Sequence, residues 1–234
     1  MKKFSSDGTD RKKMLKAVII SAMSMFLFII FTCGSLNIVI YDKDFYYQQY
    51  EKNNVYPQLS LDVNTSKQIA TNVTNNVIAY FHHKEELRYF NDKEASHMSD
   101  VRGVLDSFSY VYYASVICLI ILFFYLYHRS KDDRTEFIDI ITQSMIYSSI
   151  ACITLFVMLF LLCMFYFNQT FTIFHLIFFP QGNWQFPGGL MITMFTESFF
   201  SNAFIRIFEY AMFQSIIFLG IGYWLNKQLR NYKK

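Results

Sequence analysis

Four long apolar runs constrain the fold of this chain more than any other feature. Residues 17–41, 108–127, 138–167 and 203–225 are each long enough for a helix that crosses the hydrocarbon core of a bilayer, which takes about 20 residues. Hydrophobic residues make up 53% of the chain and aromatic residues 20%, far more than in an ordinary soluble domain. The sequence therefore predicts an all-α integral membrane protein, with four transmembrane helices in a single membrane domain, 1–234.

The first run could also be the apolar region of a secretory signal peptide. It is longer than such regions usually are, and no A-x-A-like cleavage site follows it. We therefore expect this run to be an uncleaved first span.

Basic residues predict which side of the membrane each connection faces. Six lysines and arginines precede the first run, three lie between the second and third runs, and four follow the fourth. The connection 166–203 has none, and the seven in segment 42–107 count little, because long segments are translocated largely regardless of charge. We expect a multi-pass protein of the cell membrane with both termini in the cytoplasm and segments 42–107 and 168–202 outside.

The first outer segment is predicted to form a partly helical cap. Between residues 64 and 81, apolar side chains recur at helical spacing with polar ones between them, at Ile69, Val73, Val77 and Tyr80. This pattern is typical of an amphipathic helix. Tyrosines in the same segment suit the aromatic belt of a membrane interface: Tyr46, Tyr47, Tyr50 and Tyr56.

His97 lies just before the second run, where Ser96 or Ser99 could cap the helix that leads into the membrane. Two interpretations are open at this point. The segment could be a helix start with solvated charges, or His97 could be a proton acceptor whose ring is oriented by Glu94 or Asp100.

His175 lies in the apolar stretch 171–180, which is too short to cross a bilayer. We expect this stretch to be a re-entrant or interfacial segment, with the ring among neighbouring phenylalanines. The imidazole could be hydrogen-bonded to a helix carbonyl and have no further role. It could also take part in proton transfer, because ionisable groups at membrane depth are often functional.

The region that follows His175 contains further polar candidates among aromatic residues. Trp184 is placed to anchor at the interface, and Glu197 is an acid flanked by aromatic side chains. Arg206 and Glu209 have the spacing of an ion pair within a helix. Alternatively, Arg206 or Arg102 could bind an anionic lipid headgroup.

The chain shows no pattern of metal, nucleotide or serine-nucleophile chemistry. Its four cysteines lie inside apolar runs without CxxC spacing, and no G-x-S-x-G, H-E-x-x-H or phosphate loop occurs. A net charge of +3 is too small to suggest nucleic-acid binding. We expect no cofactor, no metal and no nucleic-acid partner.

Taken together, three of these stretches resemble the lipoprotein intramolecular transacylase family of the bacterial cell envelope. The four-span layout with a large first outer segment also agrees. The chain departs from the family pattern at Thr196, where a proline is common, and at Gly188-Gly189, where an aspartate is. The matching motifs are Glu94-x-x-His97-Met98-x-Asp100-Val101, Phe174-His175-x-x-Phe178-Phe179, Trp184-x-Phe186 and Phe195-x-Glu197-x-Phe199-Phe200.

The resemblance implies an acyltransferase that moves the sn-2 acyl chain of a diacylglyceryl-modified lipoprotein. The acceptor would be the α-amino group of the lipoprotein's own N-terminal cysteine, and the product a lyso-form lipoprotein. His97 and His175 would be catalytic, one as base and the other polarising the ester or donating the proton. Supporting or substrate-positioning residues would be Glu94, Asp100, Arg102, Trp184, Glu197 and Arg206.

This function requires His97 and His175 to converge on one site that faces the outer side of the membrane. The partners would be the modified lipoprotein and membrane lipid. The alternative is a non-catalytic membrane sensor or accessory protein that binds a ligand or partner through segment 42–107.

Overall fold

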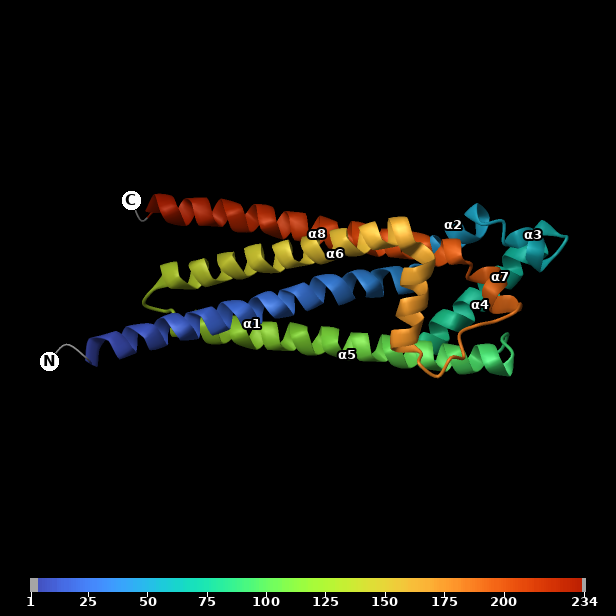
Figure 1. The fold of residues 1–234 in the computed structure, drawn as a ribbon, viewed down its shortest axis with the longest axis horizontal. Helices are drawn as coiled ribbons and strands as arrows, with labels where there is room; N and C mark the ends of the chain where they lie inside the picture. The colour runs from blue at the N-terminus through green and yellow to red at the C-terminus, as the bar shows by residue number, and fades with distance from the viewer. Residues whose placement is uncertain (1–3, 233–234) are drawn as a thin grey trace. The chain divides into compact units, whose positions relative to one another are not determined.

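The computed structural model describes residues 4–232, which are mostly helical with no strand among them (Figure 1). Lys2, Lys3, Lys233 and Lys234, which contribute to the charge argument above, lie outside the described residues. The helices are α1 (Phe4–Tyr41), α2 (Lys43–Lys52), α3 (Tyr56–Leu59), α4 (Val63–Phe81), α5 (Asp92–Arg129), α6 (Arg134–Phe178), α7 (Leu190–Met194) and α8 (Glu197–Tyr232).

Four of these helices, α1, α5, α6 and α8, are long and apolar enough to cross a membrane, and each contains one of the predicted runs. The expected all-α fold with four membrane-length helices is confirmed. The 38 residues of α5 extend for about 57 Å, nearly twice the thickness of a hydrocarbon core of about 30 Å. Part of this helix must therefore lie outside the hydrocarbon.

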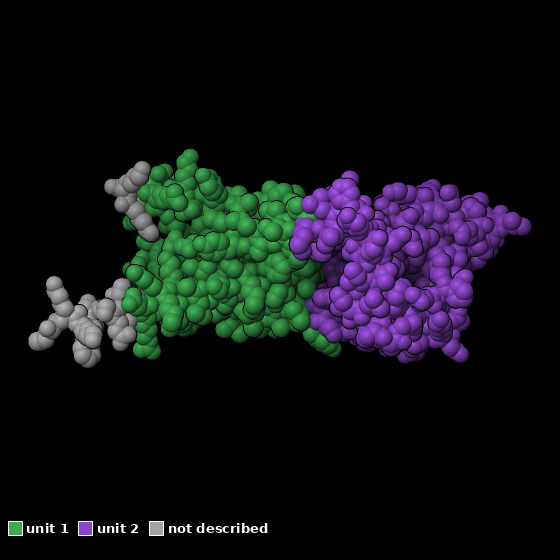
Figure 2. Space-filling view, in the orientation of Figure 1, with its two compact units in different colours: residues 1–34, 110–157, 209–234 green, residues 35–109, 158–208 purple. Residues whose placement is uncertain are grey.

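The chain forms two compact units, coloured separately in Figure 2. Of the described residues, unit 1 contains 4–34, 110–157 and 209–232, and unit 2 contains 35–109 and 158–208. The core of unit 1 joins α1, α5 and α6 through the buried side chains of Ile19, Ile20, Met23, Leu126 and Ile140. Unit 1 thus consists of segments of the four long helices, whereas unit 2 contains all of the short ones.

In unit 2, α4 is the amphipathic helix that the pattern at 64–81 predicts. Asp62 caps its N-terminus by accepting a hydrogen bond from the Thr65 amide at 2.6 Å. Val73 and Val77 are buried on one face of the helix. The predicted helix is confirmed, and it begins one residue earlier than the pattern indicated.

The aromatic belt proposed for Tyr46, Tyr47, Tyr50 and Tyr56 is wrong for two of these four tyrosines. Tyr46 and Tyr50 are only 6% and 0% exposed, and both rings pack against Phe199 of α8. The Tyr50 hydroxyl bonds that of Thr74 at 2.9 Å, and burial raises the pKa of Tyr50. Composition alone cannot distinguish such interior aromatic residues from interfacial ones, because both kinds lie beside polar residues in the sequence.

α6 changes direction at Tyr166, where the backbone leaves the helical region with φ −139° and ψ 43° (Figure 1). The kink lies one residue before the predicted end of the third run. The following stretch, 167–178, is a separate short helical segment that contains His175. This segment is the one that the sequence marks as too short to span.

Two glycines of α8 provide a matched test of packing in unit 1. A Cβ on Gly222 would lie 3.0 Å from Cγ1 of Ile146 and 3.4 Å from the carbonyl oxygen of Thr142, whereas a Cβ on Gly220 would meet nothing within 4 Å. We expect Gly222→Leu to lower the free energy of unfolding by about 1–3 kcal/mol through overpacking. Gly220→Leu should change it by less than about 0.5 kcal/mol. Thermal unfolding in detergent measures both, and equal effects would contradict the packing described here.

Candidate functional site

The two histidines singled out in the sequence lie together within unit 2. His97 is on the second turn of α5, and His175 is on the segment of α6 that follows the kink. Their ring centroids are 6.1 Å apart and their planes are inclined by 26°. The rings are buried, with only 6% of His97 and 7% of His175 exposed.

Aromatic side chains enclose the histidine pair. Phe179 contacts both rings, with centroid distances of 4.8 Å to His97 and 5.5 Å to His175. Trp184, which was expected to anchor at the interface, packs its indole on His175 at 4.6 Å. The remaining members of this aromatic enclosure are Phe171, Phe174 and Phe186.

A backbone hydrogen bond determines the orientation of His175. Its Nδ1 lies 2.8 Å from the carbonyl oxygen of Phe171, one helical turn earlier. A carbonyl oxygen can only accept, so Nδ1 carries the hydrogen. This is the helix-carbonyl bond left open by the sequence, and it leaves Nε2 of His175 for a substrate or a proton.

His97 lacks the direct carboxylate partner that the sequence suggested. Its Nδ1 is buried and has no hydrogen-bond partner among residues 4–232. Asp100 and Asn183 both interact electrostatically with the His97 ring. Neither Glu94 nor Asp100 therefore bonds Nδ1 of His97 directly. A hydrogen bond that orients the ring at this nitrogen must come from another group.

Glu94 instead joins the start of α5 to α7. Its carboxylate is almost fully buried, and it accepts hydrogen bonds from the backbone N–H groups of Met191 at 2.9 Å and Asn91 at 3.1 Å. The side chain of Asn91 in turn accepts from the Glu94 amide at 3.0 Å, which completes a reciprocal capping box. The expectation that Ser96 or Ser99 caps this helix is wrong, because Asn91 starts it earlier.

Asp100 ties α5 to the loop that follows His175. Its Oδ2 accepts from the side-chain amides of Gln181 at 2.6 Å and Asn183 at 2.5 Å. The Asn183 amide also donates to the Ser96 hydroxyl at 3.3 Å. Sequence reasoning missed both amide residues. The available signal was two amide side chains between two aromatic stretches, directly before Trp184.

The other candidate residues lie in different surroundings. The guanidinium of Arg102 stacks over the Tyr80 ring at 4.0 Å, a cation–π contact within the cap. Glu197 is exposed as the first residue of α8, where a carboxylate stabilises the helix N-terminus. Arg206 is half-buried further along α8. Their roles in positioning the substrate stay predictions.

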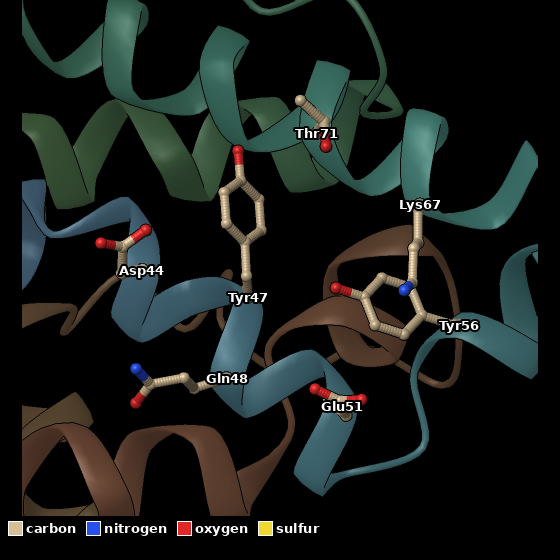
Figure 3. A pocket seen from close by; sticks show the side chains of 7 residues that line it. All are labelled: Asp44, Tyr47, Gln48, Glu51, Tyr56, Lys67 and Thr71. Carbon is tan, nitrogen blue, oxygen red and sulfur yellow. The ribbon is translucent and has the colours of Figure 1, made fainter. Parts of the chain in front are cut away.

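A hollow with a volume of about 450 Å³ lies within segment 42–107, apart from the histidine pair (Figure 3). Side chains of α2 and α4 face each other across it, together with Tyr56 of α3. This cap pocket is polar and contains no histidine, and its position suits the ligand-binding alternative. Its lining is Asp44, Tyr47, Gln48, Glu51, Tyr56, Lys67 and Thr71.

Comparisons with known proteins identify relatives of this fold. The family model described as "Lipoprotein intramolecular transacylase Lit" matches residues 19–200. A structure of the membrane integral lipoprotein intramolecular transacylase from Bacillus cereus has a TM-score of 0.78 and 22% identity, over 93% of this chain and 99% of that one. A structure of a histidine-to-arginine variant of that protein has a TM-score of 0.78 and 21% identity, over 97% of this chain and 99% of that one. No curated protein sequence matches the chain.

Adjacent glycines test the contact between Glu94 and the loop before α7. Gly189 has a positive φ of 123°, and a Cβ there would clash with Oε1 of Glu94, whereas a Cβ on Gly188 would meet nothing within 4 Å. We expect Gly189→Ala to lower the melting temperature by several degrees, because strain of this kind costs about 1–3 kcal/mol. Gly188→Ala should leave it unchanged. A melting temperature of Gly189→Ala equal to that of the wild type would show that the buried carboxylate does not hold this loop.

Proposed function

The chain belongs to the lipoprotein intramolecular transacylase family, and we propose that it transfers an acyl chain within a diacylglyceryl-modified lipoprotein. The sn-2 acyl chain moves to the α-amino group of the N-terminal cysteine, which leaves a lyso-form lipoprotein with one glycerol acyl chain. The observation that carries this proposal is the buried pair of His97 and His175, whose ring centroids are 6.1 Å apart. Two imidazoles in one enclosure suit a reaction that moves a proton between nitrogen and oxygen.

We place both termini in the cytoplasm and the histidine pair at the extracytoplasmic face of the cell membrane. The distribution of lysine and arginine supports this orientation, since connection 166–203 contains none. His97 is the sixth residue of a helix about twice as long as a hydrocarbon core is thick, which suits a site at the membrane surface. The acylated lipoprotein would then reach the enclosure from the outer leaflet.

The transfer balances without a further reactant. A bond forms between the α-nitrogen and the ester carbonyl carbon, and the bond from that carbon to the sn-2 oxygen breaks. One proton leaves the nitrogen, and one reaches the departing oxygen. The chemical task of the protein is therefore to accept a proton, donate a proton and stabilise the negative charge that develops on the carbonyl oxygen.

The two rings divide these tasks in the proposed mechanism. His97 acts as the base that takes the proton from the amine. Because Nδ1 of His175 carries its hydrogen to Phe171, Nε2 can donate only after it has taken up the proton that His97 removed from the amine. It then hydrogen-bonds the carbonyl oxygen or delivers that proton to the leaving oxygen. Two adjacent imidazolium ions would repel, so the pair carries at most one extra proton, the one taken from the amine, which passes from His97 to His175 during turnover. If His175 is instead the base and His97 the donor, the same two atoms take part, Nε2 of each ring.

Orientation and exclusion of water supply the rest of the acceleration. Amine and ester belong to one molecule, and good alignment of such groups can be worth about 7–11 kcal/mol. The aromatic enclosure around Phe179 and Trp184 would hold the ester against the rings. It would also limit access of water, which would otherwise hydrolyse the ester.

Ligand binding through segment 42–107 is the second candidate function, and the cap pocket of Figure 3 is the observation in its favour. A sensor or accessory protein of this kind would keep its function when both histidines are replaced. Family membership and the enclosed histidine pair favour acyl transfer.

Replacement of either histidine tests the proposal. We expect His97→Gln and His175→Gln to lower the rate of lyso-form production at least about 100-fold, the usual contribution of a positioned acid or base. Mass spectrometry of lipoproteins from cells that carry each variant gives the measurement, with protein level and melting temperature as checks on folding.

The matched control for these variants is His128→Gln, since His128 is exposed near the end of α5 within unit 1. Its conversion rate should equal that of the wild type. Near-normal conversion by His97→Gln would exclude the proposed mechanism.

A mixture of two substrates tests whether transfer occurs within one molecule. One lipopeptide has a deuterated sn-2 chain and an ordinary peptide, and the other has an ordinary chain and an isotopically heavy peptide. We expect each N-acylated product to retain its own chain, because amine and ester are bound together. Products with exchanged chains would contradict intramolecular transfer and favour a free acyl donor.

A further inference from the structure

Asp100 determines how the Asn183 amide is oriented. The Asp100 carboxylate accepts a hydrogen bond from Asn183 Nδ2 at 2.5 Å, and the Ser96 hydroxyl accepts a second one at 3.3 Å. A carboxylate can only accept, so the nitrogen of the amide must face it. Gln181 donates to the same carboxylate oxygen at 2.6 Å and supports it from the loop side. This arrangement assigns the amide orientation and directs Oδ1 of Asn183 away from Asp100.

Oδ1 of Asn183 and Nδ1 of His97 are both buried, and neither has a hydrogen-bond partner among the described residues. Burial lowers the pKa of His97, and the Asn183 side chain acts in the opposite sense, as a hydrogen-bond acceptor beside the ring does. Buried polar atoms are nearly always paired, because an unpaired one costs about 1–3 kcal/mol. One atom is an obligatory acceptor and the other can be a donor, so the simplest pairing is between them.

We propose that Asn183 is a positioning residue for the reaction, whose Oδ1 accepts the Nδ1–H of His97 while Asp100 holds the amide in place. This inference rests on the proposed function, because it explains how His97 becomes the base. With Nδ1 protonated, the neutral ring presents an unprotonated Nε2 to the amine. The amide also accepts from the imidazolium that forms when the proton is taken.

A neutral amide has an advantage over a carboxylate at this position. A carboxylate in direct contact would form an ion pair with the imidazolium and hold the proton, whereas turnover requires His97 to release it. Asp100 acts on His97 through the side-chain amide of Asn183, so the negative charge does not touch the ring. The chain therefore has an Asp100–Asn183–His97 relay in place of the direct contact that the sequence suggested.

The tautomer of His97 in the wild-type protein tests this relay without any substitution. Nitrogen-15 spectra of the imidazoles in detergent distinguish protonated from unprotonated ring nitrogens, and His97→Gln assigns the His97 signals. We expect the neutral ring to carry its hydrogen on Nδ1. A ring protonated on Nε2 would overturn the inference, and so would an even mixture of the two tautomers.

Removal of the amide tests the effect on turnover. We expect Asn183→Ala to lower kcat about 10- to 100-fold, the usual effect of removing a partner that orients a functional histidine, with KM little changed. The hydrogen on His97 should then distribute between both ring nitrogens. The matched control is Gln185→Ala, an exposed side chain in the same loop, which should retain wild-type kcat and tautomer.

Exchange of the two polar residues distinguishes positioning from simple support of the loop. Asp100→Asn and Asn183→Asp together keep an amide-to-carboxylate hydrogen bond and place an acceptor beside His97. We expect this double variant to have a higher kcat than Asn183→Asp alone, in which two carboxylates meet. If the losses of kcat in Asp100→Asn and in Asn183→Asp simply add in the double variant, the two residues act independently and the relay is contradicted.

The outcomes separate this inference from the proposed function. Loss of activity in His97→Gln together with a wild-type kcat and tautomer in Asn183→Ala would overturn the relay and leave the proposed function standing. Full activity in His97→Gln would overturn both.

Discussion

Glu94 accepts hydrogen bonds from the backbone of two segments, one directly before it and one 97 residues later in the chain. A buried carboxylate is costly unless it is hydrogen-bonded, so these donors and the close approach of Gly189 belong together. The contact fixes the start of α5, where His97 lies, and also the N-terminus of α7. Asp100, less than two turns later, binds the loop that follows His175. The two carboxylates therefore hold in place the chain that encloses the histidine pair.

The enclosure determines which chemistry is open to the two rings. Both imidazoles are buried among aromatic side chains, and within residues 4–232 only one of the four ring nitrogens, Nδ1 of His175, is bonded to the backbone. The other three are available to a substrate, a proton or a neighbouring amide. Such a site suits a reaction between two groups of one molecule, because the protein needs only to align them, move a proton and exclude water.

Much of the architecture could be predicted from the sequence, because membrane-length apolar runs and a helical period are local signals. They located the four long helices, each of which extends beyond its predicted run, and the bounds of α4 to within one residue. The proximity of His97 and His175 was expected from a family resemblance, since no local pattern links residues so far apart. Asn183 was missed because its importance comes from long-range contacts with Ser96, Asp100 and His97. The role of Glu94 was misjudged for the same reason: its partner Met191 is distant in sequence.

The most direct test of acyl transfer at the histidine pair uses the purified protein and a synthetic diacylglyceryl lipopeptide in lipid vesicles. Transfer within one molecule is an isomerisation, so the intact mass of the lipopeptide should stay constant while fragmentation shows one acyl chain moving from glycerol to the terminal nitrogen. A fall in mass by one fatty acid, or no change in the fragments, would contradict the account.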